Sequence, residues 1–144
     1  MAIVWPAFAL VALTAFTVVR LARLRFAGVA AGQVDPRFYK SFRGAGETEE
    51  AAVTARHLNN LTESPTLFYA GTAIALAAGI AGALLVGLAW AYVAARVVHS
   101  VIHLGPNKVL WRFRAFAISW LLLLAYWVVL GLRLVENGAA PAAA

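Results

Sequence analysis

Residues 64–95, SPTLFYAGTAIALAAGIAGALLVGLAWAYVAA, form a stretch of 32 residues without a charged side chain. A transmembrane helix needs about 20 apolar residues, so the stretch is too long for one span and too short for two separate spans. The segment Gly79-Ile80-Ala81-Gly82 favours a tight turn near its middle. We therefore expect a helical hairpin whose two helices are completed by the polar residues on either side.

The composition of the whole chain is that of a membrane protein. Its 144 residues are 63% hydrophobic and 12% charged, whereas soluble domains have about 25% charged and about 45–50% apolar residues. A disordered chain would be poorer in apolar residues. The net charge of +6 does not indicate nucleic-acid binding, because the cations lie between apolar stretches. The chain has no cysteine, which excludes disulfides and cysteine-ligated metals.

Two further uncharged runs, residues 1–19 and 115–132, are each about long enough to cross a bilayer. The predicted fold is therefore all-α: an integral membrane four-helix bundle that forms a single domain over residues 1–144. The spans are expected near residues 2–22, 56–79, 83–104 and 112–133, with a long loop at residues 23–55. Helix-forming sequence begins at Glu47 and should be kinked or restarted at Pro65.

Basic residues are concentrated in the two odd-numbered loops and next to them. By the positive-inside rule, both loops face the cytoplasm and both termini lie outside. Many of these cations serve as membrane anchors in the simplest interpretation. The basic residues on this side are Arg20, Arg23, Arg25, Arg37, Lys40, Arg43 and Arg56 around the first loop, and Lys108, Arg112 and Arg114 at the third.

Polar side chains also recur inside the predicted spans at helical spacing. Arg20 ends the first span and Arg112 lies at the start of the fourth, so all four helices carry polar groups at the cytoplasmic level. Arginines bind carboxylates and Glu63 could bind an ammonium group, so the set suits a small polyanionic ligand with an amine. The sets that share one helix face are Arg56, Asn60 and Glu63, and Arg96, His99, Ser100 and His103.

Simpler roles are possible for several of these residues. Arg96 could be an ion-pair partner of Glu63, because intramembrane charges tend to pair. Asn60 could form a hydrogen bond between helices. The pair of His99 and His103 could ligate a metal or haem, but it lacks a third ligand and His57 is the only other histidine. We therefore predict no metal site.

Two longer motifs point to a known family. Residues 56–69 read RHLNNLTESPTLFY, and residues 96–105 read RVVHSVIHLG, with Arg112 following. They resemble, in order, the second-helix motif and the third- and fourth-helix signature of the MAPEG family, the membrane-associated proteins in eicosanoid and glutathione metabolism. Val19-Arg20-Leu21 is similar to the family's first-helix exit. The resemblance is strongest to the short bacterial branch, which implies the bacterial inner (plasma) membrane.

The resemblance implies a homotrimer that binds glutathione, as a co-substrate, between subunits near the cytoplasmic face. Arg112 matches the arginine that contacts the glutathione sulfur, where a guanidinium favours the thiolate nucleophile. Arg20 would reach the glutathione carboxylate from the adjacent chain. A lipophilic small-molecule electrophile would arrive from the membrane lipid. By position, the residues that hold glutathione would be Arg56, Asn60, Glu63, Arg96 and His99, with His103 standing where the eukaryotic enzymes have a tyrosine.

Three functions are compatible with these residues. We expect a glutathione transferase or peroxidase that acts on lipophilic electrophiles. The second is a non-catalytic membrane scaffold or accessory subunit that binds lipid or a partner complex. The third is a transporter or proton relay built on His99, His103 and Glu63, against which the lack of an internal repeat counts.

The chain also departs from the family pattern at two positions. Phe116 replaces a tyrosine of the eukaryotic enzymes, and Asn59 replaces an arginine found in some of them.

Overall fold

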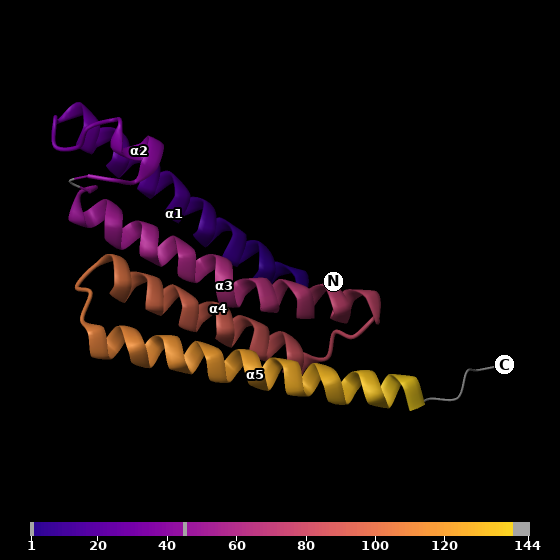
Figure 1. Ribbon diagram of the computed structural model, residues 1–144. Coiled ribbons are helices and arrows are strands. Elements are labelled where there is room, and N and C mark those ends of the chain that lie inside the picture. The colour runs from indigo at the N-terminus through magenta and orange to yellow at the C-terminus, as the bar shows by residue number, and fades with distance from the viewer. Residues whose placement is uncertain (1, 45, 140–144) are drawn as a thin grey trace.

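A computed structural model describes residues 2–44 and 46–139 of the protein. Over these residues it contains four long helices and one short helix. The long helices lie side by side in the order α1, α3, α4 and α5 (Figure 1). Helix α1 packs mainly on α3, and α4 packs mainly on α5. The prediction of an all-α fold is confirmed. The helices are α1 (Val4–Ala30), α2 (Phe38–Ser41), α3 (Glu49–Ala77), α4 (Ala83–Leu104) and α5 (Val109–Ala139).

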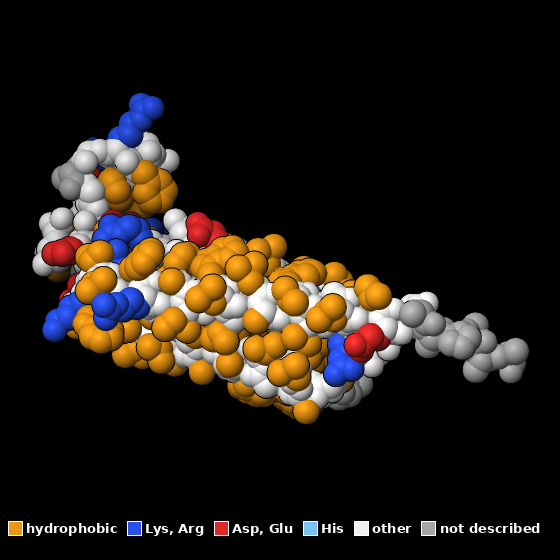
Figure 2. Space-filling view, turned by 90° about the horizontal axis from the view of Figure 1, so that it is seen from below, with side chains coloured by type: hydrophobic (Ala, Val, Ile, Leu, Met, Phe, Trp, Pro, Cys, Tyr) orange, Lys and Arg blue, Asp and Glu red, His pale blue; other side chains and the backbone are white. Residues whose placement is uncertain are grey.

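Three of these helices are long and apolar enough to cross a membrane: α1, α4 and residues Val109–Gly138 of α5. Helix α3 is as long, but polar side chains in its first half lower its hydropathy. Large apolar side chains are exposed along α1, α4 and α5. Figure 2 shows them covering most of one face, with Lys and Arg side chains gathered mainly at one end. Such a surface requires lipid contact, so the chain is an integral membrane protein.

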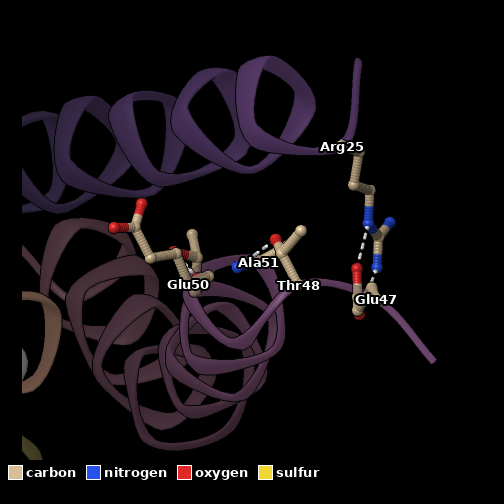
Figure 3. Close-up of polar contacts among 6 residues, drawn as sticks. Arg25, Glu47, Thr48, Glu50 and Ala51 are labelled. Carbon is tan, nitrogen blue, oxygen red and sulfur yellow. Dashed lines mark hydrogen bonds and ion pairs between the residues drawn. The ribbon is translucent and has the colours of Figure 1, made fainter. Parts of the chain in front are cut away.

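The segment between α1 and α3 is shorter than the predicted loop, because α1 continues to Ala30 and α3 begins at Glu49. The span limits themselves stay predictions, since a helix can extend beyond the bilayer. Two contacts fix the start of α3 (Figure 3). Arg25 on α1 forms an ion pair with Glu47 at 2.9 Å, and the Thr48 hydroxyl accepts a hydrogen bond from the Ala51 N–H.

The turn between α3 and α4 lies where the glycine-rich segment predicts it. Gly79 has a φ of 68°, a left-handed conformation that favours glycine, and the Ile80 N–H donates to the Ala75 carbonyl at 2.8 Å. The turn between α4 and α5 contains Asn107 with a φ of 47°. This second turn lies at the same end of the molecule as the α1–α3 connection (Figure 1).

Helix α3 continues through Pro65, so the restart predicted as one alternative at this residue is wrong, and the other alternative, a kink, stays a prediction. A proline inside a helix removes one backbone hydrogen bond and crowds the preceding turn. Pro65 itself is buried, as are Leu61 before it and Phe68 after it. We infer that packing on both sides of the proline compensates for the lost bond and keeps the segment helical.

An aromatic core joins α3, α4 and α5 in the half of the molecule away from the basic end. Phe68, Tyr92 and Tyr126 are each 0% exposed, and the Phe68 ring lies 5.0 Å from Tyr92 and 5.3 Å from Tyr126 between centroids. The Tyr92 hydroxyl forms a hydrogen bond with Ser64 Oγ at 3.1 Å, and the Tyr126 hydroxyl forms one with Thr72 Oγ1 at 3.4 Å. These bonds satisfy the polar ends of both tyrosines in an apolar environment.

Candidate functional site

A cavity of about 310 Å³ opens between α3, α4 and the first turns of α5. Most of the residues that the sequence singled out for ligand binding line it, from all three helices. The remaining three predicted residues, Glu63, Arg96 and Arg20, lie elsewhere and are described below. The lining residues are Arg56, Asn60, His99, His103, Val109, Arg112, Phe113 and Phe116.

Arg112, the predicted catalytic residue, is half-buried at the edge of this cavity. Its Nη1 donates a hydrogen bond to the side-chain oxygen of Asn107 at 2.6 Å. Asn107 sits in the α4–α5 turn, and its left-handed conformation is one that asparagine tolerates better than most residues. The sequence predicts a turn at Gly105-Pro106-Asn107 but contains no signal for this contact, so the residue that positions Arg112 was missed.

Arg96 is completely buried on α4, one turn before His99. Its Nη2 donates to the backbone carbonyl of Asn60 at 2.8 Å, while its Nε and Nη1 have no hydrogen-bond partner within residues 2–44 and 46–139. Glu63 is exposed. Over residues 2–44 and 46–139 the structure contains no Arg96–Glu63 ion pair, so that alternative role for Arg96 is wrong within one chain. The Asn60 carbonyl takes the place of the carboxylate.

Arg20 lies at a second cavity, of about 220 Å³, formed with the start of α3 and the end of α4. Its Nε is buried and has no hydrogen-bond partner in the part of the chain that the structure describes. His103 lines both cavities, so the two spaces lie on either side of one imidazole. Within a single chain, Arg20 is therefore not brought together with Arg112.

The three histidines of the chain lie together, although they come from two helices. Their rings are 5.0 Å apart between His57 and His103, 5.4 Å between His99 and His103, and 5.7 Å between His57 and His99. All three are buried. The prediction of no metal site assumed that His99 and His103 lack a third ligand. His57 supplies one, because one nitrogen from each ring lies within 4.8 Å of the others.

Apart from Arg112, the side of the cavity formed by α5 is apolar. Val109, Phe113 and Phe116 line it, and the side chains of Val109 and Phe113 are also 68% and 65% exposed on the outer surface. The Phe116 ring lies 5.8 Å from the His99 ring between centroids. The α3 and α4 residues of the cavity, together with Arg112, are thus cationic or hydrogen-bonding, and the apolar α5 residues are continuous with the apolar outer surface.

The fold and the site together place this chain in the class of all-helical membrane proteins with a cationic cavity between their helices. The model of the MAPEG family matches residues 3–132, and the chain belongs to that family. It is therefore a membrane protein of the kind that acts in glutathione and eicosanoid metabolism, whose members typically use glutathione. No curated protein and no solved structure matches the chain.

Proposed function

We propose that this protein is a glutathione-dependent transferase or peroxidase of the bacterial inner membrane, which acts on lipophilic electrophiles. Glutathione occupies the 310 Å³ cavity, and Arg112 stabilises its thiolate. The observation that carries the proposal is a set of cationic and unpartnered polar groups that line one cavity from three helices. Arg56 and Arg112 line it. Three imidazole nitrogens are buried there and have no partner among the residues that the structure describes: His99 Nε2, His103 Nδ1 and His103 Nε2.

These groups match the chemistry of a small anionic peptide. Buried polar groups in proteins are nearly always hydrogen-bonded, and each one left without a partner costs about 1–3 kcal/mol. A bound molecule with carboxylates and amides would supply the missing acceptors and donors. Arg56 would bind a carboxylate, and the imidazoles would bind the peptide groups.

Arg112 contributes to the reaction through its charge. A thiol with an ordinary pKa near about 8.5 is mostly protonated at neutral pH, and a nearby guanidinium favours the thiolate, which is the nucleophile. In the transferase reaction the thiolate sulfur forms a bond to the electrophilic carbon, and the leaving group departs with its electron pair. In the peroxidase reaction two glutathione molecules supply two electrons, which reduce a hydroperoxide to an alcohol and water and leave glutathione disulfide.

The apolar wall of the cavity gives the electrophile its route. Val109 and Phe113 belong both to the cavity and to the exposed surface, so a lipid-dissolved molecule can approach between them without crossing water. The two reactants then meet at the membrane boundary, where a fixed orientation contributes to the rate in addition to the activated thiolate.

A homotrimer of four-span subunits would account for the two predicted residues that lie outside the cavity. Glu63 is exposed, and Arg20 lines a separate cavity on the far side of His103. In a trimer, Arg20 of the adjacent subunit would reach the glutathione carboxylate, and Glu63 would bind its ammonium group at the interface. In the same proposal residues 56–79 of α3 form the second of four spans, in addition to the three apolar helices. The loops after α1 and α4 face the cytoplasm, and the termini lie outside.

The test is a glutathione titration of the detergent-solubilised full chain, followed by the ultraviolet absorbance of the thiolate and by thermal shift. We expect a thiolate signal and a rise in melting temperature. Arg112→Ala should abolish the thiolate signal and lower kcat by about 10²–10³-fold, as loss of one electrostatic contact to a reacting atom typically does. Arg112→Lys should retain part of the signal.

The matched control is Arg114→Ala, which removes an exposed cation two residues along the same helix. Its guanidinium lies over the Trp111 ring at 5.1 Å and does not line the cavity, so the thiolate signal should be unchanged. No thiolate signal and no thermal shift in the intact chain would contradict the proposal. That result would favour the non-catalytic scaffold that binds lipid or a partner complex.

A further inference from the structure

The histidine cluster, formed by His57, His99 and His103, combines burial with unused ligand atoms. The side chains are 0%, 2% and 3% exposed, respectively. Both ring nitrogens of His57 and of His103, and Nε2 of His99, have no hydrogen-bond partner among the described residues. Five unpartnered nitrogens at one place need a physical reason, because burial of such groups without a partner is costly.

One hydrogen bond shows how His99 would present a ligand atom. Its Nδ1 lies 3.1 Å from the backbone carbonyl oxygen of Arg112. A carbonyl oxygen only accepts, so Nδ1 carries the proton and Nε2 keeps its lone pair. Nε2 is the buried atom without a partner. Histidines that bind metals typically donate their other N–H to a backbone carbonyl or carboxylate in this way, which fixes the orientation of the ring.

We infer that the histidine cluster is a binding site for a Zn²⁺ ion, with one nitrogen from each of the three imidazoles as ligands. Three protein ligands and one open position are the arrangement of catalytic zinc sites. Tetrahedral Zn–N bonds of about 2.0–2.1 Å place ligand nitrogens about 3.3 Å apart. The cluster nitrogens lie within 4.8 Å of one another, so small rotations of the rings close the site.

The charges around the histidine cluster favour an anion as the fourth ligand. Arg96 is buried one turn before His99, and Arg56 and Arg112 line the cavity onto which His99 and His103 open. These cations would repel a bare dication, and a thiolate or hydroxide bound to the metal would offset that repulsion. If the proposed function holds, the glutathione thiolate takes this position, and the Zn²⁺ ion takes the place of a glutathione peptide group at His99 Nε2. This last step alone rests on that function.

The experiment uses the full chain in detergent without a histidine tag. The chain has three histidines and no cysteine, so histidine-dependent metal binding can come only from the cluster. Zn²⁺ is titrated into chelator-treated protein, once with glutathione and once without, and bound metal is measured by elemental analysis. Co²⁺ is used as a spectroscopic probe, since a tetrahedral site gives intense visible bands. We expect one metal ion per chain and a tetrahedral Co²⁺ spectrum.

His57→Ala should weaken Zn²⁺ binding by more than about 100-fold, beyond the 10–100-fold typical for loss of an outer partner of a metal ligand. His57→Gln keeps a polar side chain of similar size and should have the same effect, and far-ultraviolet circular dichroism shows whether each variant folds. The control Asn59→Ala removes an exposed amide two residues away and should bind Zn²⁺ like the intact chain.

Two results would overturn the inference: no stoichiometric Zn²⁺ binding in either titration, or binding that is equally strong in a folded His57 variant. Both are separable from failure of the proposed function. His57 does not line the 310 Å³ cavity, so glutathione binding to chelator-treated protein is measured independently, by thermal shift. Loss of Zn²⁺ binding with retained glutathione binding would therefore identify the metal site as distinct from the peptide site.

Discussion

The two halves of the molecule differ in whether their buried polar groups have hydrogen-bond partners. Around Phe68, the two buried tyrosine hydroxyls each meet a serine or threonine hydroxyl. Near the α4–α5 turn, Arg96 and the histidine cluster bury nitrogens that have no partner among the described residues. An unpartnered buried group costs about 1–3 kcal/mol. The first half therefore gains stability from its hydrogen-bonded hydroxyls, whereas the unpartnered nitrogens of the second half support the proposed ligand site.

The largest effect should come from removing the centre of the aromatic core. Phe68→Ala leaves a cavity between α3, α4 and α5, and we expect the free energy of unfolding to fall by about 3–5 kcal/mol. Unfolding in detergent, by heat or denaturant, measures this. Leu84→Ala, at a side chain that is 60% exposed, is the control and should change stability little. Equal losses in both variants would remove the basis for calling this half the stabilising one.

In the half near the α4–α5 turn, substitutions should change the chemistry of the proposed site more than the stability of the chain. Asn107→Gly removes the acceptor of the Arg112 hydrogen bond and keeps a residue that tolerates the φ of 47°. We expect Arg112 to lose its fixed position, and kcat/KM to fall by about 10-fold, which corresponds to about 1.4 kcal/mol. The readout specific to positioning is the pH midpoint of glutathione thiolate formation, which should rise. An unchanged midpoint would show that Asn107 has only a structural role.

The stabilities of Tyr92→Phe and His57→Leu, measured in metal-free protein, compare the two halves directly. Tyr92→Phe should destabilise the chain by about 1 kcal/mol, because it removes a hydrogen bond and leaves the Ser64 hydroxyl without that partner. His57→Leu replaces a buried imidazole whose two nitrogens lack partners over the described ranges 2–44 and 46–139, so the melting temperature should stay the same or rise. A larger loss in the histidine variant than in the tyrosine variant would contradict the distinction between the two halves.

The smallest effect should come from the ion pair that joins the end of α1 to the start of α3. Glu47→Gln removes the negative partner of Arg25, and we expect a loss of about 0.2–1 kcal/mol, the range for pairs close to solvent. The loss should shrink as salt is added, because screening weakens the pair in the intact chain. A stability change that does not depend on salt would indicate that Glu47 acts through packing instead.

Much of the fold can be predicted from local sequence. The uncharged runs locate the long helices, and the glycine-rich segment around Gly79 locates the α3–α4 turn. The effect of Pro65 on α3 was not predictable in the same way, because packing against neighbouring helices outweighs the local preference of one residue. The end of α1 at Ala30 was not predictable either, because the uncharged run indicates only the part of the helix that crosses the bilayer.

The candidate site likewise has one part that local sequence predicts and one part that only the tertiary structure shows. Helical spacing placed Arg56 with Asn60, and His99 with His103, because residues three or four apart share a helix face whatever surrounds the helix. The contact of Asn107 with Arg112 depends on how the α4–α5 connection folds. The position of His57 in the histidine cluster depends on which turn of α3 faces which turn of α4. Such contacts join residues far apart in the chain or in an irregular turn, and side-chain packing between helices selects them, a property that no stretch of local sequence encodes.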